Sequence, residues 1–154
     1  MTNYKEILTT LPSLIEDNEF DITILSNTSA LLYQYLENVN WVGFYLNKNN
    51  TLLLGPFQGK VACTKIPFHR GVCGVCATKQ ETILVNNVYE FEGHIACDAA
   101  SKSELCIPIV IHNQLYGVLD IDSPEYNRFN ETDKESLEQV VTIIEKQLKT
   151  SEIS

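Results

Sequence analysis

Cysteines are the residues of this 154-residue chain with the clearest capacity for chemistry. There are five of them: Cys63, Cys73, Cys76, Cys97 and Cys106. A thiolate is both a nucleophile and a metal ligand, whereas a thiol buried in an apolar core is inert. Cys73 and Cys76 have the C-x-x-C spacing that occurs in zinc sites and in thioredoxin-like dithiols. The spacing alone leaves a metal site, a redox pair and simple core packing open.

The metal-site and dithiol interpretations each require particular residues elsewhere in the chain. A zinc site needs a second close pair of ligands, and the nearest candidates have no standard spacing: Cys63, His69, His94 and Cys97. A thioredoxin-like dithiol needs a βαβ unit, but the C-x-x-C follows a break containing Pro and Gly. A third interpretation uses distant cysteines, with Cys97 as a reactive thiol in a long loop. His94 or a helix N-terminus would then help to ionise it.

Three carboxylates gather at one end of an expected hairpin. Glu104 opens one strand, Asp120 and Asp122 close the other, and the turn is expected at 112–114. Residues two apart on a strand point to the same face, so Asp120 and Asp122 share a face and antiparallel pairing brings Glu104 near them. Mutual repulsion raises the pKa of some of these groups, which lets them donate a proton at neutral pH. They could equally bind an ammonium group or a metal, or simply be solvated at a strand end.

Two aromatic residues, Trp41 and Tyr45, are four apart on an expected strand and therefore also share a face. Such residues usually belong to a core. They could instead form an apolar wall for a ligand.

The elements that must position these groups follow from hydrophobic periodicity. Two N-terminal helices are expected within residues 1–38, with Pro12 interrupting the first and the second running over 20–36. The remaining expected elements are strands at 41–46, 52–54, 60–66 and 82–85, a short helix at 72–79, an irregular stretch at 86–101, and hairpin strands at 105–111 and 115–121. Pro108 predicts an edge or a bend in its strand. A capping box of Thr132 and Glu135 opens a final helix over 132–149.

This order predicts an α+β fold, a mostly antiparallel sheet over 40–122 with helices packed on it, in a single domain spanning 1–154. A hydrophobic content of 44% is typical of globular proteins, and the formal charge of −9 argues against nucleic-acid and anionic-membrane partners. The amphipathic, acidic N-terminus lacks the features of a signal peptide, so a cytoplasmic location is expected. Its first helix could pack on its own domain or on a second copy in a homodimer.

Taken together, four segments resemble the free methionine-(R)-sulfoxide reductases, which are small enzymes with a GAF fold. The segments are Gly71-Val72-Cys73-Gly74, Gly93-His94-Ile95-Ala96-Cys97-Asp98, Ser101-x-Ser103-Glu104 with Pro108, and Gly117-Val118-Leu119-Asp120-Ile121-Asp122-Ser123. The resemblance runs from about Trp41 to the final helix, and the N-terminal helices fit it too. A generic GAF domain does not carry the G-H-I-A-C-D motif together with two upstream cysteines.

The resemblance implies a role for each cysteine that matches the family pattern. Cys97 matches the nucleophile that reduces the sulfoxide, Cys63 its resolving partner, and Cys73 a third cysteine that can take part in disulfide formation. Cys76 and Cys106 lie outside the pattern, so the C-x-x-C spacing would be incidental.

The resemblance also implies a substrate site. The family's substrate-binding carboxylates match Glu104, Asp120 and Asp122, and its apolar wall matches Trp41 and Tyr45. The substrate implied is free L-methionine-(R)-sulfoxide, with a thioredoxin-type dithiol as the partner that regenerates the enzyme. A role in oxidative stress follows, and neither a cofactor nor a metal is expected.

Two other functions use parts of the same pattern. A non-catalytic GAF sensor of small molecules would need neither Cys97 nor Cys63. A thiol-based redox sensor would use both cysteines but not the carboxylates. Replacing Glu104 by Gln should leave a sensor's disulfide chemistry intact and should cripple a reductase.

Overall fold

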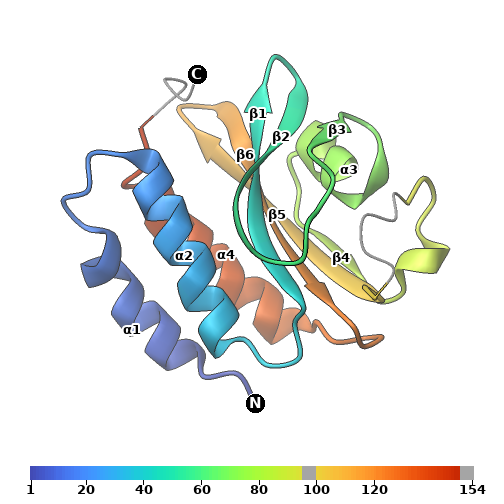
Figure 1. Ribbon diagram of the computed structural model, residues 1–154, viewed down its shortest axis with the longest axis horizontal. Coiled ribbons are helices and arrows are strands. Elements are labelled where there is room, and N and C mark those ends of the chain that lie inside the picture. Colours follow the sequence, from blue (N-terminus) through green and yellow to red (C-terminus); the bar gives the residue numbers. More distant parts are fainter. Residues whose placement is uncertain (95–99, 150–154) are drawn as a thin grey trace.

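A six-stranded antiparallel sheet forms the centre of the computed structural model, which describes residues 1–94 and 100–149 (Figure 1). The strands are β1 (Trp41–Lys48), β2 (Thr51–Gly59), β3 (Lys65–Pro67), β4 (Ile83–Val85), β5 (Ser103–Ile111) and β6 (Gln114–Ser123). The helices are α1 (Tyr4–Ile15), α2 (Asp21–Tyr35), α3 (Gly71–Lys79) and α4 (Glu131–Glu145), with a 3-10 turn η1 at Val88–Glu90. The strand order is β3-β2-β1-β6-β5-β4. This arrangement confirms the predicted α+β fold.

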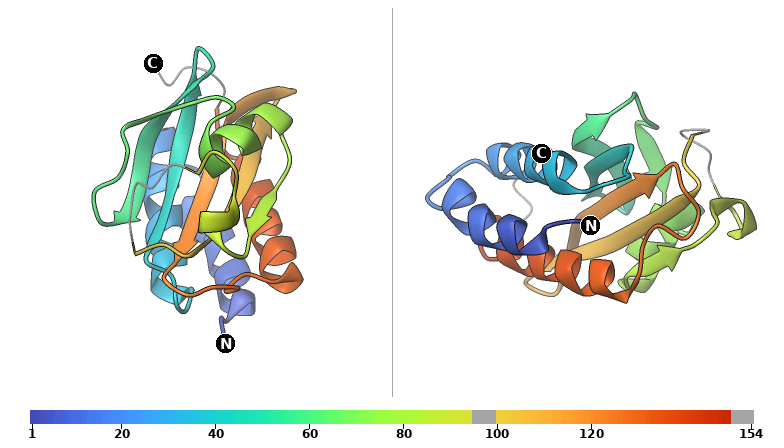
Figure 2. Two further views of the ribbon diagram at one scale, coloured as in Figure 1. Left: turned by 90° about the vertical axis from the view of Figure 1, so that its right-hand side faces the viewer. Right: turned by 90° about the horizontal axis from the view of Figure 1, so that it is seen from below.

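The two faces of the sheet are covered differently. Helices α1, α2 and α4 lie on one face, and α3 lies on the other (Figures 1 and 2). Strand alternation divides the side chains between them: Val42 and Phe44 belong to the core under the three helices, whereas Trp41 and Tyr45 belong to a second cluster with α3. The α3 face is therefore the side on which the predicted site residues of β1 lie.

The β5–β6 hairpin has the register that the sequence predicts. Glu104 pairs with Asp122 and Cys106 pairs with Asp120, so all four belong to the α3 face. The turn is shorter than expected, because His112 and Asn113 both have positive φ and close the hairpin in two residues. At Pro108 the strand is an edge, since β4 pairs only with residues 104–106.

Helix α1 continues through Pro12, contrary to the predicted interruption. Pro12 is exposed, and the loss of one backbone hydrogen bond there is offset because Ile7, Leu11 and Ile15 are fully buried on the opposite face. These three side chains belong to the chain's own core, so the apolar face of α1 is covered without a second copy. None of the described helices is long and apolar enough to cross a bilayer.

Helix α4 starts earlier than the predicted capping box. Asn130 is the N-cap, its side chain accepts from the Asp133 N–H, and the Asp133 side chain accepts from the Asn130 N–H. Asn is as good an N-cap as Thr, and Asp at the third helical position completes the same reciprocal pattern two residues upstream of Thr132 and Glu135. The helix ends at Glu145 and not at residue 149.

The third predicted strand is also shorter than expected. Only Lys65–Pro67 pairs with β2, and residues 60–64 form a loop. Two backbone carbonyls of this loop accept hydrogen bonds from side chains, at 3.2 Å from Trp41 Nε1 to Lys60 and at 2.9 Å from the Tyr45 hydroxyl to Cys63. Side chains of β1 thus hold the loop in place of a strand partner.

Candidate active site

A pocket lies on the α3 face of the sheet, with about 550 Å³ of empty space that is partly open to solvent. Of the eight residues to which the family resemblance assigns a catalytic or substrate-binding role, six line it: Trp41, Tyr45, Cys73, Glu104, Asp120 and Asp122. They come from three strands and one helix. The fold therefore brings into one place residues that are up to 81 positions apart in the chain.

The floor of this pocket is a cluster of three carboxyl groups. One oxygen each from Glu104, Asp120 and Asp122 lies within 4.8 Å of the others. Glu104 is 7% exposed and Asp120 is 5% exposed. Asp120 Oδ1 has no hydrogen-bond partner among the described residues. A buried carboxyl oxygen without a partner is costly, so it marks a place where a donor from a ligand would be stabilising.

The cluster favours holding a proton on Glu104. Burial raises the pKa of Glu104 well above that of an ordinary carboxyl group, and the Asp120 and Asp122 carboxylates raise it further. Burial also raises the pKa of Asp120, but hydrogen bonds from Glu104 and Cys73 oppose that rise. Both carboxyl groups are thus less acidic than ordinary ones, so the pair of Glu104 and Asp120 favours holding a proton at neutral pH.

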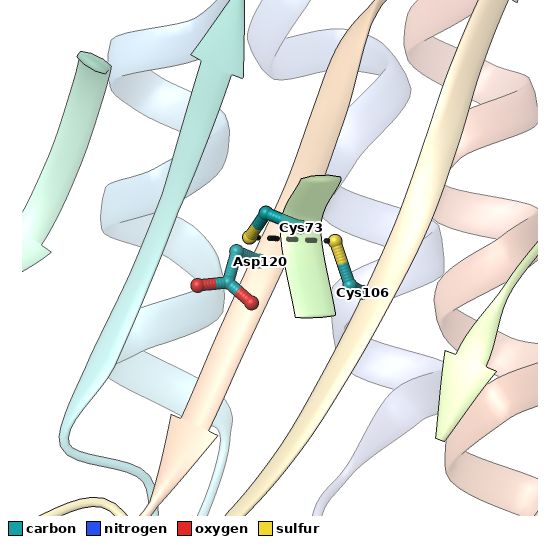
Figure 3. A group of neighbouring side chains, drawn as sticks. All are labelled: Cys73, Cys106 and Asp120. Atoms are coloured by element: carbon teal, nitrogen blue, oxygen red, sulfur yellow. Dashed lines mark hydrogen bonds between the residues drawn. The ribbon is translucent and has the colours of Figure 1, made fainter. Parts of the chain in front are cut away.

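The buried thiols of Cys73 and Cys106 lie next to the Asp120 carboxyl group (Figure 3). Cys106 Sγ is 3.7 Å from Cys73 Sγ, and Cys73 Sγ donates to Glu104 Oε2 over 3.8 Å. The Cys106 thiol lowers the pKa of Cys73, but burial and the neighbouring carboxylates outweigh it and raise that pKa to about 12. Cys73 is thus a thiol, not a thiolate, at neutral pH. Cys76 is buried too, as expected for core packing.

Cys63 differs from these cysteines because it is disulfide-bonded, whereas Cys73, Cys76 and Cys106 are free thiols. It lies in the loop of residues 60–64. The predicted nucleophile Cys97 lies outside the described residues.

An aromatic wall closes one side of the pocket. The rings of Trp41 and Tyr45 stack with centroids 5.8 Å apart, and Trp41 stacks on Phe57 at 5.3 Å. Burial, together with the nearby carboxyl groups and Cys73, raises the pKa of Tyr45, so its hydroxyl remains a donor. The sequence predicted the shared face of Trp41 and Tyr45 but gave no sign that both also anchor the 60–64 loop.

Two features of the pocket were not foreseen from the sequence. Arg70 is the only Lys or Arg among the described residues that line it. Helix α3 begins at the next residue, Gly71, whose φ of 67° favours glycine, and no side chain caps its first turn. The Gly71 N–H donates to the Gly93 carbonyl and the Gly74 N–H donates to the Arg70 carbonyl, each at 3.1 Å. The Val72 and Cys73 N–H groups of this first turn lack intrahelical acceptors, so together with Arg70 this end of the pocket suits an anion. In the sequence, the Arg70-Gly71 pair directly before the predicted short helix was the one sign of this anion-binding end.

Two histidines were considered for a zinc site, His69 and His94. Among the described residues, the groups with metal-ligating potential contain only the cysteines and carboxylates named above, and neither His69 nor His94 belongs to them. His94 lines the pocket instead, and burial lowers its pKa, so the imidazole is neutral at neutral pH. A neutral imidazole can accept a proton from a nearby thiol.

Comparison with known proteins gives consistent results. The GAF domain family model matches residues 22–148. A free methionine-R-sulfoxide reductase of Escherichia coli is 51% identical over 85% of this chain and 79% of its own length. The reduced form of fRMsr of Staphylococcus aureus has a TM-score of 0.94 at 53% identity, covering 97% of both chains. A free methionine-R-sulfoxide reductase of Neisseria meningitidis, solved in complex with its substrate, has a TM-score of 0.90 at 40% identity, covering 94% of this chain and 92% of its own.

Proposed function

Because this chain belongs to the GAF-domain family and, within it, to the free methionine-R-sulfoxide reductases, we propose that its pocket reduces free L-methionine-(R)-sulfoxide by thiol chemistry. The chain is an oxidoreductase by that membership. The observation that carries the proposed mechanism is the cluster of Glu104, Asp120 and Asp122, with one oxygen of each within 4.8 Å of the others, at the floor of a pocket with an aromatic wall.

The first step pairs a nucleophile with this acid. The Cys97 thiolate attacks the sulfoxide sulfur while Glu104 donates its proton to the sulfoxide oxygen. This attack forms a bond between the Cys97 sulfur and the substrate sulfur. The protonated oxygen then transfers to the Cys97 sulfur as the sulfur–sulfur bond and the original sulfur–oxygen bond break, which releases methionine and leaves a sulfenic acid on Cys97. His94, neutral and three residues before Cys97 in the chain, is suited to accept the thiol proton. A protonated carboxyl group is needed because a sulfoxide oxygen leaves poorly without a proton.

The substrate's own charges fit the two ends of the pocket. Free methionine sulfoxide carries an ammonium group, which suits the Asp120 and Asp122 carboxylates and the unpartnered Asp120 Oδ1. Its carboxylate suits the other end, where Arg70 and the first turn of α3 lie. A residue inside a polypeptide has neither charge, so this arrangement supports selection for the free amino acid. The Trp41 and Tyr45 rings would cover the apolar side chain.

The second step regenerates the site. The Cys63 thiol attacks the sulfenic acid of Cys97, water leaves, and a disulfide forms. That Cys63 is disulfide-bonded supports its role as the resolving cysteine. A thioredoxin-type dithiol then reduces this disulfide, a reaction that we expect in the cytoplasm. Cys73, protonated and hydrogen-bonded to Glu104, is better suited to orient the acid than to attack. A homodimer stays a prediction, to be tested by light scattering.

A single-turnover measurement tests this scheme. Reduced protein, freed of small thiols, is mixed with a slight excess of the R epimer, and both methionine and remaining thiols are counted. The scheme predicts one methionine released and two thiols lost per chain. Cys63→Ser should release one methionine while losing one thiol, and its Cys97 should then react with a sulfenic-acid probe. Release of methionine without thiol loss, or thiol loss that survives in Cys97→Ser, contradicts the mechanism.

A further inference from the structure

Charge is distributed very unevenly along the chain. Residues 38–80 contain five of the eleven Lys and Arg and no Asp or Glu, which gives this segment a formal charge of +5. The rest of the chain carries −14. The five basic side chains, at 48, 60, 65, 70 and 79, are all exposed. An acidic partner is therefore repelled by most of this protein and attracted by one part of it.

Part of this basic segment borders the pocket. Val61, Ala62 and Arg70 line the pocket directly, and Lys60 precedes Val61 in the same loop. Lys65 is two residues beyond Cys63, at the start of the edge strand β3. We call residues 60–70 the basic rim. No ion pair among the described residues involves its cations, so their charge is available to a partner.

The basic rim also carries an unusual apolar side chain. Val61 is 89% exposed and stands two residues from Cys63. Covering such a side chain releases water and favours a protein partner. The other loop that borders the pocket, at 86–94, is acidic instead, with Glu90 and Glu92 exposed. Among the described residues, the exposed Lys and Arg side chains of the basic rim therefore lie on the side of the pocket that holds Cys63.

The rim is held in a fixed shape before any partner arrives. Trp41 and Tyr45 donate to its carbonyls at Lys60 and Cys63, and the Leu54 N–H donates to the Thr64 carbonyl at 3.0 Å. A preorganised surface lowers the entropy lost on binding. Among these cations the substrate accounts only for Arg70, because Lys60 and Lys65 do not line the pocket and a zwitterionic amino acid has no net charge to be steered.

We infer that the basic rim is the docking surface for the reductant, and that this reductant is a small acidic protein carrying a dithiol. The inference rests on the proposed function, because it needs a disulfide at Cys63 that must be reduced in each cycle. The acidic face of the partner meets Lys60 and Lys65, which do not line the pocket, and its apolar surface covers Val61. The steering range is about 10 Å at 0.1 M salt, enough to orient the partner over Cys63.

Reduction on this surface is a two-step exchange. One thiolate of the partner attacks a sulfur of the disulfide that contains Cys63, which forms a mixed disulfide and releases the other enzyme sulfur as a thiolate. The second thiol of the partner then attacks the mixed disulfide and frees the remaining enzyme sulfur. The partner is oxidised to its own disulfide, and two electrons and two protons pass to the enzyme.

Two reductants distinguish docking from catalysis. Turnover of the R epimer is measured with a thioredoxin of acidic sequence and, separately, with dithiothreitol, a small neutral dithiol. The rim variant is Lys60→Glu with Lys65→Glu, and the matched control is Lys48→Glu with Lys79→Glu, which changes the net charge equally. Lys48 stands at the far end of β1 from Trp41, at the β1–β2 turn. Each rate is measured at low and at high salt.

At low salt, the kcat/KM of the rim variant for thioredoxin should fall at least about tenfold, and at high salt this loss should be smaller. Its rate with dithiothreitol should be unchanged. The control should stay within about twofold of the wild type with both reductants. Equal thioredoxin kinetics in the rim variant and the wild type would overturn the docking surface, and so would equal losses in rim and control variants. Absence of wild-type turnover with dithiothreitol would instead reject the proposed function.

Discussion

Replacing Glu104 by Gln removes the proposed proton donor while keeping its shape. Gln retains an oxygen that can accept from the Cys73 thiol, which is 3.8 Å away, and an N–H that can donate to Asp120. The pocket should therefore keep its geometry and lose only the acid. Loss of a positioned general acid lowers turnover by about 10²- to 10⁴-fold, or about 3 to 5 kcal/mol of barrier. Steady-state kinetics should show this in kcat, with KM changed far less.

The same substitution has a predicted effect on stability. The pKa of Glu104 is raised in the folded protein, so the folded state holds this proton more strongly than the unfolded chain does. Its contribution to stability is complete below the ordinary carboxyl pKa and is lost as pH rises toward the raised pKa. Each pKa unit corresponds to about 1.4 kcal/mol. The Gln variant should lack this loss, so its unfolding free energy should fall less as pH rises from the ordinary carboxyl pKa toward the raised pKa of Glu104.

Urea denaturation at several pH values, combined with turnover on the same samples, tests both effects. Wild-type activity should decline on the alkaline side as Glu104 loses its proton, and the Gln variant should show no such decline in its residual rate. Turnover of the variant within about threefold of the wild type would refute the assignment of Glu104 as the acid. An unchanged slope of stability with pH would refute the raised pKa.

Three further substitutions have expected outcomes. Asp120→Asn should raise KM for the free amino acid at least about tenfold by removing a buried partner of the ammonium group; a change in kcat alone would contradict that role. Gly43→Ala should lower the free energy of unfolding by about 1–3 kcal/mol, because the added Cβ would lie 2.3 Å from Phe57 Cβ. An unchanged midpoint of urea denaturation would show that the sheet adapts. Tyr116→Phe removes the 3.0 Å hydrogen bond that the Tyr116 hydroxyl donates to buried Asp21, and should lower the free energy of unfolding by about 1–3 kcal/mol. The melting temperature should fall accordingly, and an unchanged melting temperature would mean that Asp21 does not need this hydrogen bond.

The parts of the site that were predictable are those fixed by strand periodicity. The two-residue period of β5 and β6 places Glu104 opposite Asp122 once the hairpin is recognised, and the same period places Trp41 and Tyr45 on one face. A helix boundary was less predictable. Thr132 and Asn130 both suit an N-cap, and only the packing of the helix decides between them.

Other parts depend on contacts that leave no local pattern. The approach of Cys106 to Cys73 joins β5 to α3 across 33 residues, so spacing in the sequence gave no sign of it. The pKa order within the carboxyl cluster depends on burial, which is a property of the whole fold. The basic segment is visible in the sequence, but its position beside the pocket and Cys63 becomes apparent only in the fold.

The most direct test of the central claim is steady-state turnover coupled to thioredoxin and thioredoxin reductase, followed by NADPH oxidation. Free L-methionine-(R)-sulfoxide, its S epimer and the N-acetylated R form are offered separately, with Cys97→Ser as control. The account predicts turnover of the free R epimer, little with the other two, and none in Cys97→Ser. Absence of turnover of every form by protein with reduced thiols would contradict it and favour a ligand- or redox-sensing GAF domain.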